Sequence, residues 1–237
     1  MSAARAPKPV PELTGPVEDY LKAIYELERA SEPAETNAIA RMLEIAPASV
    51  SGMVRRLAAQ GLITHERYRG ARLTAAGRRA ALRTLRRHRV IEAYLTSALG
   101  YSWDRVHDEA ERLEHAASDE LIDRMAAAIG EPATDPHGAP IPTRDGTLEE
   151  RSLVPLAALE SGETARVERV SDRDAGRLRY LAELGIVPGA TVQITAREPF
   201  DGPIAIRVQN SSRTIGSALA SQILVAPSST KRPRLTR

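Results

Sequence analysis

Histidine and carboxylate side chains gather in two stretches of this 237-residue sequence, with spacings that suit metal coordination. In residues 106–115 (VHDEAERLEH), a helix at about 100° per residue would bring four side chains into one stripe: His107, Glu111, Glu114 and His115. His88 and Glu92 stand four residues apart, one turn of a helix. Nitrogen and oxygen donors on successive turns suit a divalent transition metal, which also supplies the counter-charge that carboxylates turned toward an apolar face require. The spacing therefore predicts a metal site shared by two helices.

The same residues allow two other interpretations. The stripe could be a solvated helix face whose acids pair with nearby arginines, although two His/Glu helices in succession favour the metal site. A metallohydrolase would need turnover and an open coordination position. The chain has no HExxH, GxGxxG or Walker motif and no nucleophile elbow. Its lack of cysteine excludes thiolate zinc ligands and a cysteine nucleophile, so we do not expect an enzyme.

The elements ahead of this site predict a winged helix-turn-helix. An amphipathic helix starts at Thr14, which can cap it, with Pro16 suited to its first turn. Apolar periodicity predicts two short helices over 35–45 and 48–60, the second stopped at Gly61. Two β-like runs, 62–64 and 71–74, flank Gly70 and form the expected wing. This order of elements is typical of DNA-binding domains whose third helix enters the major groove.

The residues expected to contact DNA lie on the exposed face of the third helix and on the wing. The residues expected to contact base edges are Ser49, Ser51, Gly52 and Arg55. Those expected to contact phosphates are Arg56, Arg67, Arg69 and Arg72. Residues 55–89 hold eleven arginines and one acid, whereas residues 91–165 carry 5 basic and 16 acidic side chains. A small tri-helical module can also bind proteins, but the arginine block favours DNA.

Downstream, the pattern changes from long helices to short strands. One long helix is predicted over 74–99 and a single second helix over 104–130. Residues 131–151 hold four prolines without periodicity, which predicts a linker. Short alternating apolar runs over 152–226 predict a small barrel of about five strands with one helix near 177–184. No stretch approaches about 18 uninterrupted apolar residues and no signal sequence is visible, so we expect a cytoplasmic protein.

Three segments resemble the diphtheria-toxin-repressor family of metal-dependent transcriptional regulators. They are residues 14–28 (TGPVEDYLKAIYELE), Arg87-His88-Arg89 with 107–115, and the C-terminal stretch 162–225 with its run RYLAELGIVPG. Manganese-dependent members that keep a third domain are the most similar. The resemblance implies a mainly α fold with small β parts: a winged helix-turn-helix, a helical dimerisation domain and a C-terminal SH3-like β-barrel. The expected boundaries are 14–76, 77–130, a linker 131–151, 152–226 and a basic tail 227–237.

The resemblance also implies two metal sites. The primary, activating site corresponds to Asp19, Glu111, Glu114 and His115. The ancillary site corresponds to His88, Glu92 and His107, completed by Asp174 or Asp172. Iron-type members carry methionine and cysteine where this chain has Asp19 and Glu111, and the harder oxygen donors favour Mn(II), with Fe(II) second.

Some positions depart from the family pattern. Lys22 stands where short manganese-type members place a further carboxylate ligand, and a protonated lysine cannot ligate. Arg177 falls where the third domain has an amide ligand. Gly52 falls where iron-type members place a base-reading glutamine.

The expected function is that of a homodimeric repressor that binds palindromic operator DNA when metal is bound and controls metal homeostasis genes. We expect no membrane partner and no small-molecule substrate other than the metal ion. One alternative is an Fe(II)-dependent iron regulator. The other is a metal-independent winged-helix protein whose acidic helix only dimerises.

Overall fold

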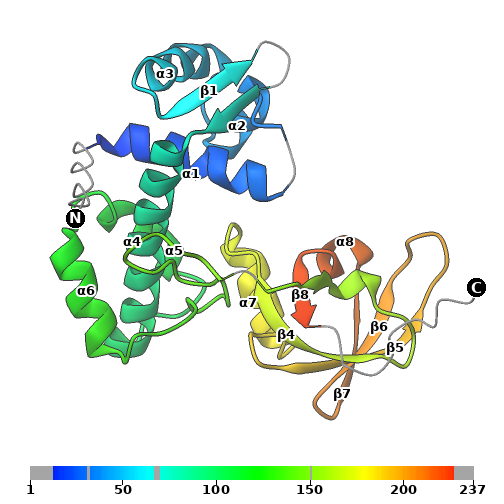
Figure 1. Ribbon diagram of the computed structural model, residues 1–237. Coiled ribbons are helices and arrows are strands. Elements are labelled where there is room, and N and C mark those ends of the chain that lie inside the picture. The colour runs from blue at the N-terminus through cyan, green and yellow to red at the C-terminus, as the bar shows by residue number, and fades with distance from the viewer. Residues whose placement is uncertain (1–12, 31–32, 67–69, 150, 227–237) are drawn as a thin grey trace, which may run out of the picture. The chain divides into compact units, whose positions relative to one another are not determined.

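The computed structural model describes residues 13–30, 33–66, 70–149 and 151–226 (Figure 1). They form two compact units. The first comprises Met1–Arg87, Leu113–Ala117 and Pro142–Thr147. The second comprises His88–Arg112, Ser118–Ile141 and Leu148–Arg237. Within the described part of the chain, no helix combines the length and apolar character that a membrane span needs.

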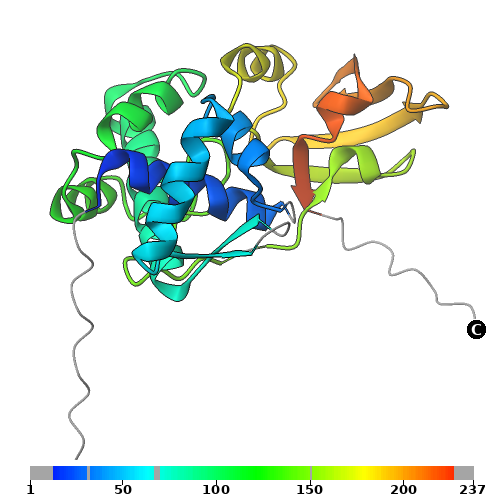
Figure 2. The same cartoon turned by 90° about the horizontal axis from the view of Figure 1, so that it is seen from above.

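The first unit contains the expected winged helix-turn-helix, seen from above in Figure 2. Its elements are α1 (Gly15–Arg29), α2 (Thr36–Met42), α3 (Pro47–Ala59), β1 (Ile63–Glu66) and β2 (Gly70–Leu73). Thr14 occupies the N-cap position of α1 in an extended conformation, and Pro16 lies in the first turn. The apolar stripes meet in a core formed by Val17, Leu21, Ile24, Ile39, Val50, Val54 and Leu57. The predicted winged helix-turn-helix fold is confirmed.

The two wing strands pair antiparallel, from Ile63 opposite Leu73 to Glu66 opposite Gly70. Gly70 has φ +78°, and a Cβ there would lie 2.9 Å from the backbone carbonyl of Ala34. Only glycine fits both this left-handed conformation and this close approach. The wing is thereby fixed against the segment that leads into α2.

The helical region departs from the prediction at one point. The long helix α4 (Ala75–Leu99) is as expected. The single helix predicted over 104–130 is wrong, because the chain forms α5 (Val106–Leu113) and α6 (Asp119–Ala128) with a turn between them. Ser118 caps α6 by accepting a hydrogen bond from the backbone N–H of Leu121 at 3.2 Å, which starts a new helix instead of continuing the old one.

The SH3-like part of the second unit is a six-stranded antiparallel sheet with strand order β3-β8-β4-β5-β6-β7. Its elements are β3 (Val154–Pro155), η1 (Leu156–Ala158), β4 (Thr164–Val170), α7 (Ala175–Glu183), β5 (Thr191–Arg197), β6 (Ile204–Val208), β7 (Ser211–Ile215), α8 (Ser217–Ala220) and β8 (Ile223–Ala226). Alternate strand residues fill the core, including Val167, Val192, Ile194, Ile206 and Val225. The SH3-like fold is confirmed, and the helix α7 lies close to its predicted position. The predicted basic tail lies outside the described residues.

The proline-rich segment is packed rather than loose over its first half. Asp135 Oδ1 accepts a hydrogen bond from the backbone N–H of His137 at 2.8 Å, and both side chains are buried. A Cβ at Gly138, whose φ is +87°, would lie 1.8 Å from the carbonyl oxygen of Glu168. The prediction of a linker over 131–151 therefore needs correction, because tertiary contacts order this segment without any periodic pattern.

Candidate metal centre

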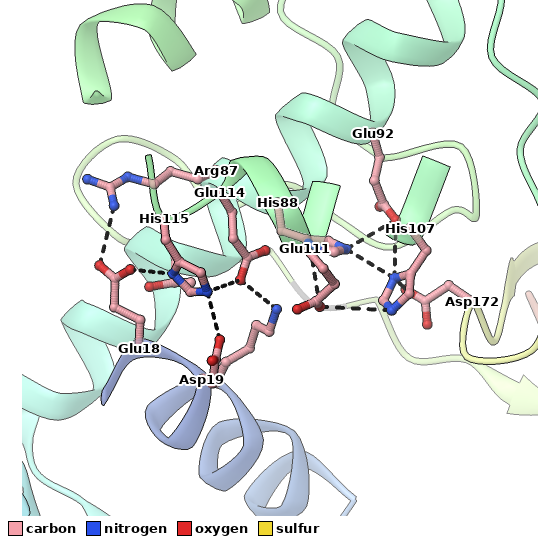
Figure 3. Close-up of polar contacts among 12 residues, drawn as sticks. Glu18, Asp19, Arg87, His88, Glu92, His107, Glu111, Glu114, His115 and Asp172 are labelled. Atoms are coloured by element: carbon pink, nitrogen blue, oxygen red, sulfur yellow. Dashed lines mark hydrogen bonds and ion pairs between the residues drawn. The ribbon is translucent and has the colours of Figure 1, made fainter. Parts of the chain in front are cut away.

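Three predicted ligands meet in the first unit, where α1 passes the turn that follows α5 (Figure 3). Asp19 Oδ1 lies 2.8 Å from His115 Nε2, which lies 3.6 Å from Glu114 Oε1. A Cβ on Gly15 would come within 3.2 Å of the His115 ring, so glycine lets the helix approach this closely. The end of α5 at Leu113 places Glu114 and His115 in the turn rather than on the predicted helical stripe. The cluster of Asp19, Glu114 and His115 is called the first cluster below.

A buried carboxylate that the sequence analysis missed orients His115. Glu18 Oε2 lies 2.7 Å from His115 Nδ1, and Arg87 Nη1 donates to Glu18 Oε1 at 3.3 Å (Figure 3). The hydrogen bonds to Asp19 and Glu18 raise the pKa of His115 to about 10, against the lowering effect of burial. With Nδ1 held by Glu18, Nε2 is the nitrogen left for a metal ion, which would replace its proton. The signal in the sequence was the acid immediately before Asp19.

Lys22 lies one turn after Asp19 on α1 and faces the same cluster. Its Nζ is 2.7 Å from Glu114 Oε1, and the Glu114 side chain is fully buried. This contact agrees with the expectation that Lys22 is not a ligand. The first cluster therefore combines two carboxylates, one imidazole and an adjacent ammonium group.

A second cluster lies in the second unit and joins α4, α5 and the SH3-like domain. Glu92 Oε1 is 3.1 Å from His88 Nε2 and 3.5 Å from His107 Nδ1. Asp172 Oδ2 lies 3.8 Å from His107 Nδ1 (Figure 3). These four residues offer ligand atoms within 4.8 Å of one another. We call them the second cluster.

Two predicted ligands are placed differently from the expectation. Asp174 is the N-cap residue of α7, accepting from the backbone N–H of Arg177 at 3.0 Å, so Asp172 joins the second cluster in its place. Glu111 Oε1 lies 3.7 Å from His88 Nδ1 and therefore beside the second cluster. Arg177 itself pairs with Asp174 and donates to Gln222.

The proline-rich segment adds two buried groups to Glu92. Asp135 and His137 are 5% and 1% exposed, and His137 Nδ1 lies 3.7 Å from Glu92 Oε1. Among the described residues, both carboxylate oxygens of Glu92, Asp135 Oδ2 and His137 Nδ1 have no hydrogen-bond partner. These buried atoms have ion pairs only, such as Glu92 Oε1 with His88 and Asp135 Oδ2 with Arg89, and a cation would satisfy all three side chains. No periodic signal marks Asp135 and His137 in the sequence, only their residue types.

The charges around Glu92 shift its neighbours' proton affinities. Burial alone would raise the pKa of Glu92, but His88, His107 and His137 hold it well below its usual range. Burial, reinforced by the charge of Glu92, raises the pKa of Asp135 to about 6. Burial lowers the pKa of His137, but the adjacent negative charge of Glu92 outweighs this effect and raises the pKa to about 9. The site is thus built around one buried anion that three imidazoles surround.

The expected DNA-contacting side chains of α3 are available to a ligand. Its buried face is formed by Val50, Val54 and Leu57. The expected contact residues are all exposed: Ser49, Ser51, Gly52, Arg55 and Arg56. A Cβ at Gly52 would meet nothing within 4 Å, so this point of the helix surface is open. The predicted wing contacts Arg67 and Arg69 lie outside the described residues.

Comparisons with known proteins account for this combination of domains. Residues 12–71 match the family described as the iron dependent repressor N-terminal DNA binding domain. Residues 74–143 match the iron dependent repressor metal binding and dimerisation domain, and residues 154–227 match the FeoA domain. The iron-dependent repressor IdeR of Mycobacterium leprae is 33% identical over 196 residues, covering 77% of this chain and 85% of that one. The chain belongs to the iron-dependent repressor family.

Solved structures of this repressor family share the fold. A manganese-dependent transcriptional repressor in complex with manganese has 40% identity and a TM-score of 0.84, covering 89% of this chain and 99% of that one. IdeR of T. acidophilum has 30% identity and a TM-score of 0.74, covering 96% of this chain and 100% of that one. The chain is therefore a metal-dependent transcriptional repressor of this family and not an enzyme. The matched metal binding and dimerisation domain includes Asp135 and His137 as well as the predicted ligands of α4 and α5.

Proposed function

We propose that this repressor is activated by Mn(II) bound at the first cluster and then binds palindromic operator DNA as a homodimer. The observation that carries the proposal is the 2.8 Å approach of Asp19 on α1 to His115 Nε2. α1 packs within the winged helix-turn-helix, whereas Glu114 and His115 follow α5. Ligands from both sides would fix α1 relative to the turn, and α1 in turn contacts α2 and β2 of the reading head.

The donor set supports a hard divalent ion. Asp19, Glu114 and His115 offer oxygen and imidazole nitrogen, and the chain contains no cysteine. Mn(II) accepts such ligands readily, while affinity alone would follow the Irving–Williams order. The similar solved repressor in complex with manganese supports this choice. Fe(II) is the second candidate, because relatives such as the Mycobacterium leprae protein are named iron-dependent.

The chain's own residues explain how occupancy could alter DNA binding. Without the ion, Asp19 and Glu114 rely on the proton of His115 and on Lys22 for counter-charge. A bound ion supplies two positive charges to the same carboxylates and favours the arrangement in which α1 is held against the turn. The equilibrium moves toward the DNA-competent state by the difference in the ion's affinity for the two states.

A homodimer is supported by the match of residues 74–143 to a metal binding and dimerisation domain. Leu99 and Leu121 in this domain are 58% and 45% exposed. Two reading heads held by a dimer would meet successive major grooves about one helical turn of DNA apart.

The test is a DNA-binding titration against a library of palindromic AT-rich probes in chelator, Mn(II), Fe(II), Zn(II) or Mg(II) at fixed salt. Salt must be fixed because phosphate contacts make every affinity depend on it. We expect specific binding only with a transition metal, with Mn(II) effective at low concentration. His115→Ala should abolish this dependence, whereas Glu120→Ala, at an exposed ion pair on α6, should not. Equal binding in chelator would instead favour the metal-independent winged-helix protein.

A further inference from the structure

Lys22 holds the carboxylate oxygen that the proposed metal ion needs. Its Nζ lies 2.7 Å from Glu114 Oε1, and the same oxygen is 3.6 Å from His115 Nε2. The Lys22 side chain is only 16% exposed and that of Glu114 is fully buried. Lysine and metal ion would therefore meet at one atom.

The energetics of a buried carboxylate make this contact a competition. A fully buried carboxylate needs a counter-charge, and in the metal-free protein Lys22 provides one. An ammonium group has no lone pair while it is protonated, so it cannot become a metal ligand. A divalent ion bound by Glu114 must either displace the ammonium group from Oε1 or remain within a few ångströms of a like charge. Either outcome makes metal binding less favourable than it would be with a neutral side chain at position 22.

We propose that Lys22 is a tethered cation that competes with the activating metal ion for Glu114 and so sets the metal concentration at which this repressor responds. The inference rests on the proposed function of the first cluster. Competition subtracts a similar free energy from the binding of every divalent ion. Ions that bind carboxylates and imidazole weakly, such as Mg(II), are thereby kept from activating the protein at concentrations where Mn(II) still binds.

The test compares the Mn(II) affinity of the full chain with that of Lys22→Met, which keeps an unbranched apolar stem but removes the charge. Isothermal titration calorimetry should show a dissociation constant lower by about tenfold or more, because a like charge about 4 Å away is removed. Lys22→Arg retains the charge and should remain near the unmodified protein. Arg29→Met is the matched control, since Arg29 is also on α1, is 18% exposed and pairs with Glu26 at 3.5 Å. It should leave the affinity unchanged.

Thermal unfolding supplies a readout without DNA. Lys22→Met leaves Glu114 buried without its ammonium partner, so the unfolding temperature of the metal-free protein should fall. The rise in unfolding temperature that Mn(II) causes should become larger. Unchanged or weaker Mn(II) binding by Lys22→Met would overturn the inference and show that Lys22 preorganises Glu114 instead. That result would leave the proposed function intact as long as the unmodified protein shows metal-dependent DNA binding and His115→Ala does not. A folded, unmodified protein that binds no Mn(II) would overturn both.

Discussion

At the scale of single residues, the first cluster depends on how firmly His115 is held. Its Nδ1 contacts Glu18, which Arg87 holds in turn, so the ring that carries the metal-binding nitrogen is fixed from behind. Partners of this kind set the orientation and basicity of metal-ligating histidines. The chain therefore provides the first cluster with a support that contributes no ligand itself.

Glu18→Gln should weaken Mn(II) binding by about 10- to 100-fold, because the amide is a poorer acceptor for His115 and a poorer partner for Arg87. Calorimetric titration of the metal measures the change. Glu26→Gln, which alters an ion pair elsewhere on the same helix, serves as the control. An unaltered Mn(II) affinity in Glu18→Gln would show that the ring is positioned by packing alone.

The raised pKa of His115 makes metal binding depend on pH above the usual histidine range. With a pKa of about 10 in the metal-free protein, His115 is protonated at neutral pH and must release that proton to an ion. Mn(II) affinity should therefore rise about tenfold per pH unit between pH 6 and 8, whereas an ordinary value of about 6.5 would confine the dependence to lower pH. Titrations in two buffers with different ionisation enthalpies measure the released proton. A flat affinity over this range would contradict the assignment of His115 as a ligand.

The same pKa has a consequence for the stability of the metal-free protein. Because the folded-state pKa lies above the unfolded value of about 6.5, the stabilisation from His115 is complete below that pH. It is lost as the pH rises toward the folded-state value of about 10. Denaturant unfolding in chelator should show this loss, and His115→Ala should reduce it to the part that comes from His137, whose pKa is raised to about 9.

Glu111 can be assigned to one cluster or the other by a single substitution. The family resemblance places it with the activating ion, whereas its Oε1 lies 3.7 Å from His88 Nδ1. Glu111→Ala should abolish metal-dependent DNA binding if Glu111 serves the first ion. If it serves the second cluster, the variant should retain metal-dependent DNA binding and lose affinity only for a second ion. Parallel metal titration and DNA binding distinguish the two.

At the scale of elements, the sequence predicted those parts that follow from periodicity. The helices of the reading head and the apolar strands of the SH3-like domain each carry a repeating core pattern. The break between α5 and α6 was missed because residues 113–117 (LEHAA) are good helix formers. Ser118 followed by two acids was the available start signal, and it was outweighed by the continuing apolar pattern. Asp135 and His137 were missed because only tertiary contacts place them.

The recognition helix α3 provides a prediction at this scale. Arg55 and Arg56 are adjacent and exposed, but Arg55 is expected at base edges and Arg56 at phosphates. Arg55→Ala should reduce the difference in binding free energy between operator and non-specific DNA by about 1–3 kcal/mol. Arg56→Ala should weaken binding to all sequences alike. Competition titrations with operator and unrelated duplexes give both ratios, and an unchanged ratio for Arg55→Ala would exclude a base contact.

At the scale of the whole molecule, consecutive residues of α4 support the first cluster and belong to the second. Arg87 supports Glu18 in the first unit, while His88 and Glu92 belong to the second cluster. The second cluster also draws Asp172 from the segment between β4 and α7. The helical and SH3-like parts of the second unit therefore share one group of titratable side chains.

That shared group predicts how a second ion would act. The oxygens of Glu92 and Nδ1 of His137 are buried without a hydrogen bond, so they could bind a cation. At a hundredfold excess over its dissociation constant, this cation should stabilise the second unit by about 2.7 kcal/mol. His137→Ala should lower the bound metal, measured by elemental analysis, from two ions per chain to one, because Asp135 and His137 form a ligand group with Glu92 of the second cluster. It should also reduce the metal-induced rise in unfolding temperature while leaving metal-dependent DNA binding in place, because the first cluster is intact. His65→Ala, at an exposed histidine of β1, is the control. A count of one ion per chain in both the unmodified protein and His137→Ala would show that the buried groups around Glu92 neutralise one another by sharing protons, and that this repressor uses a single ion.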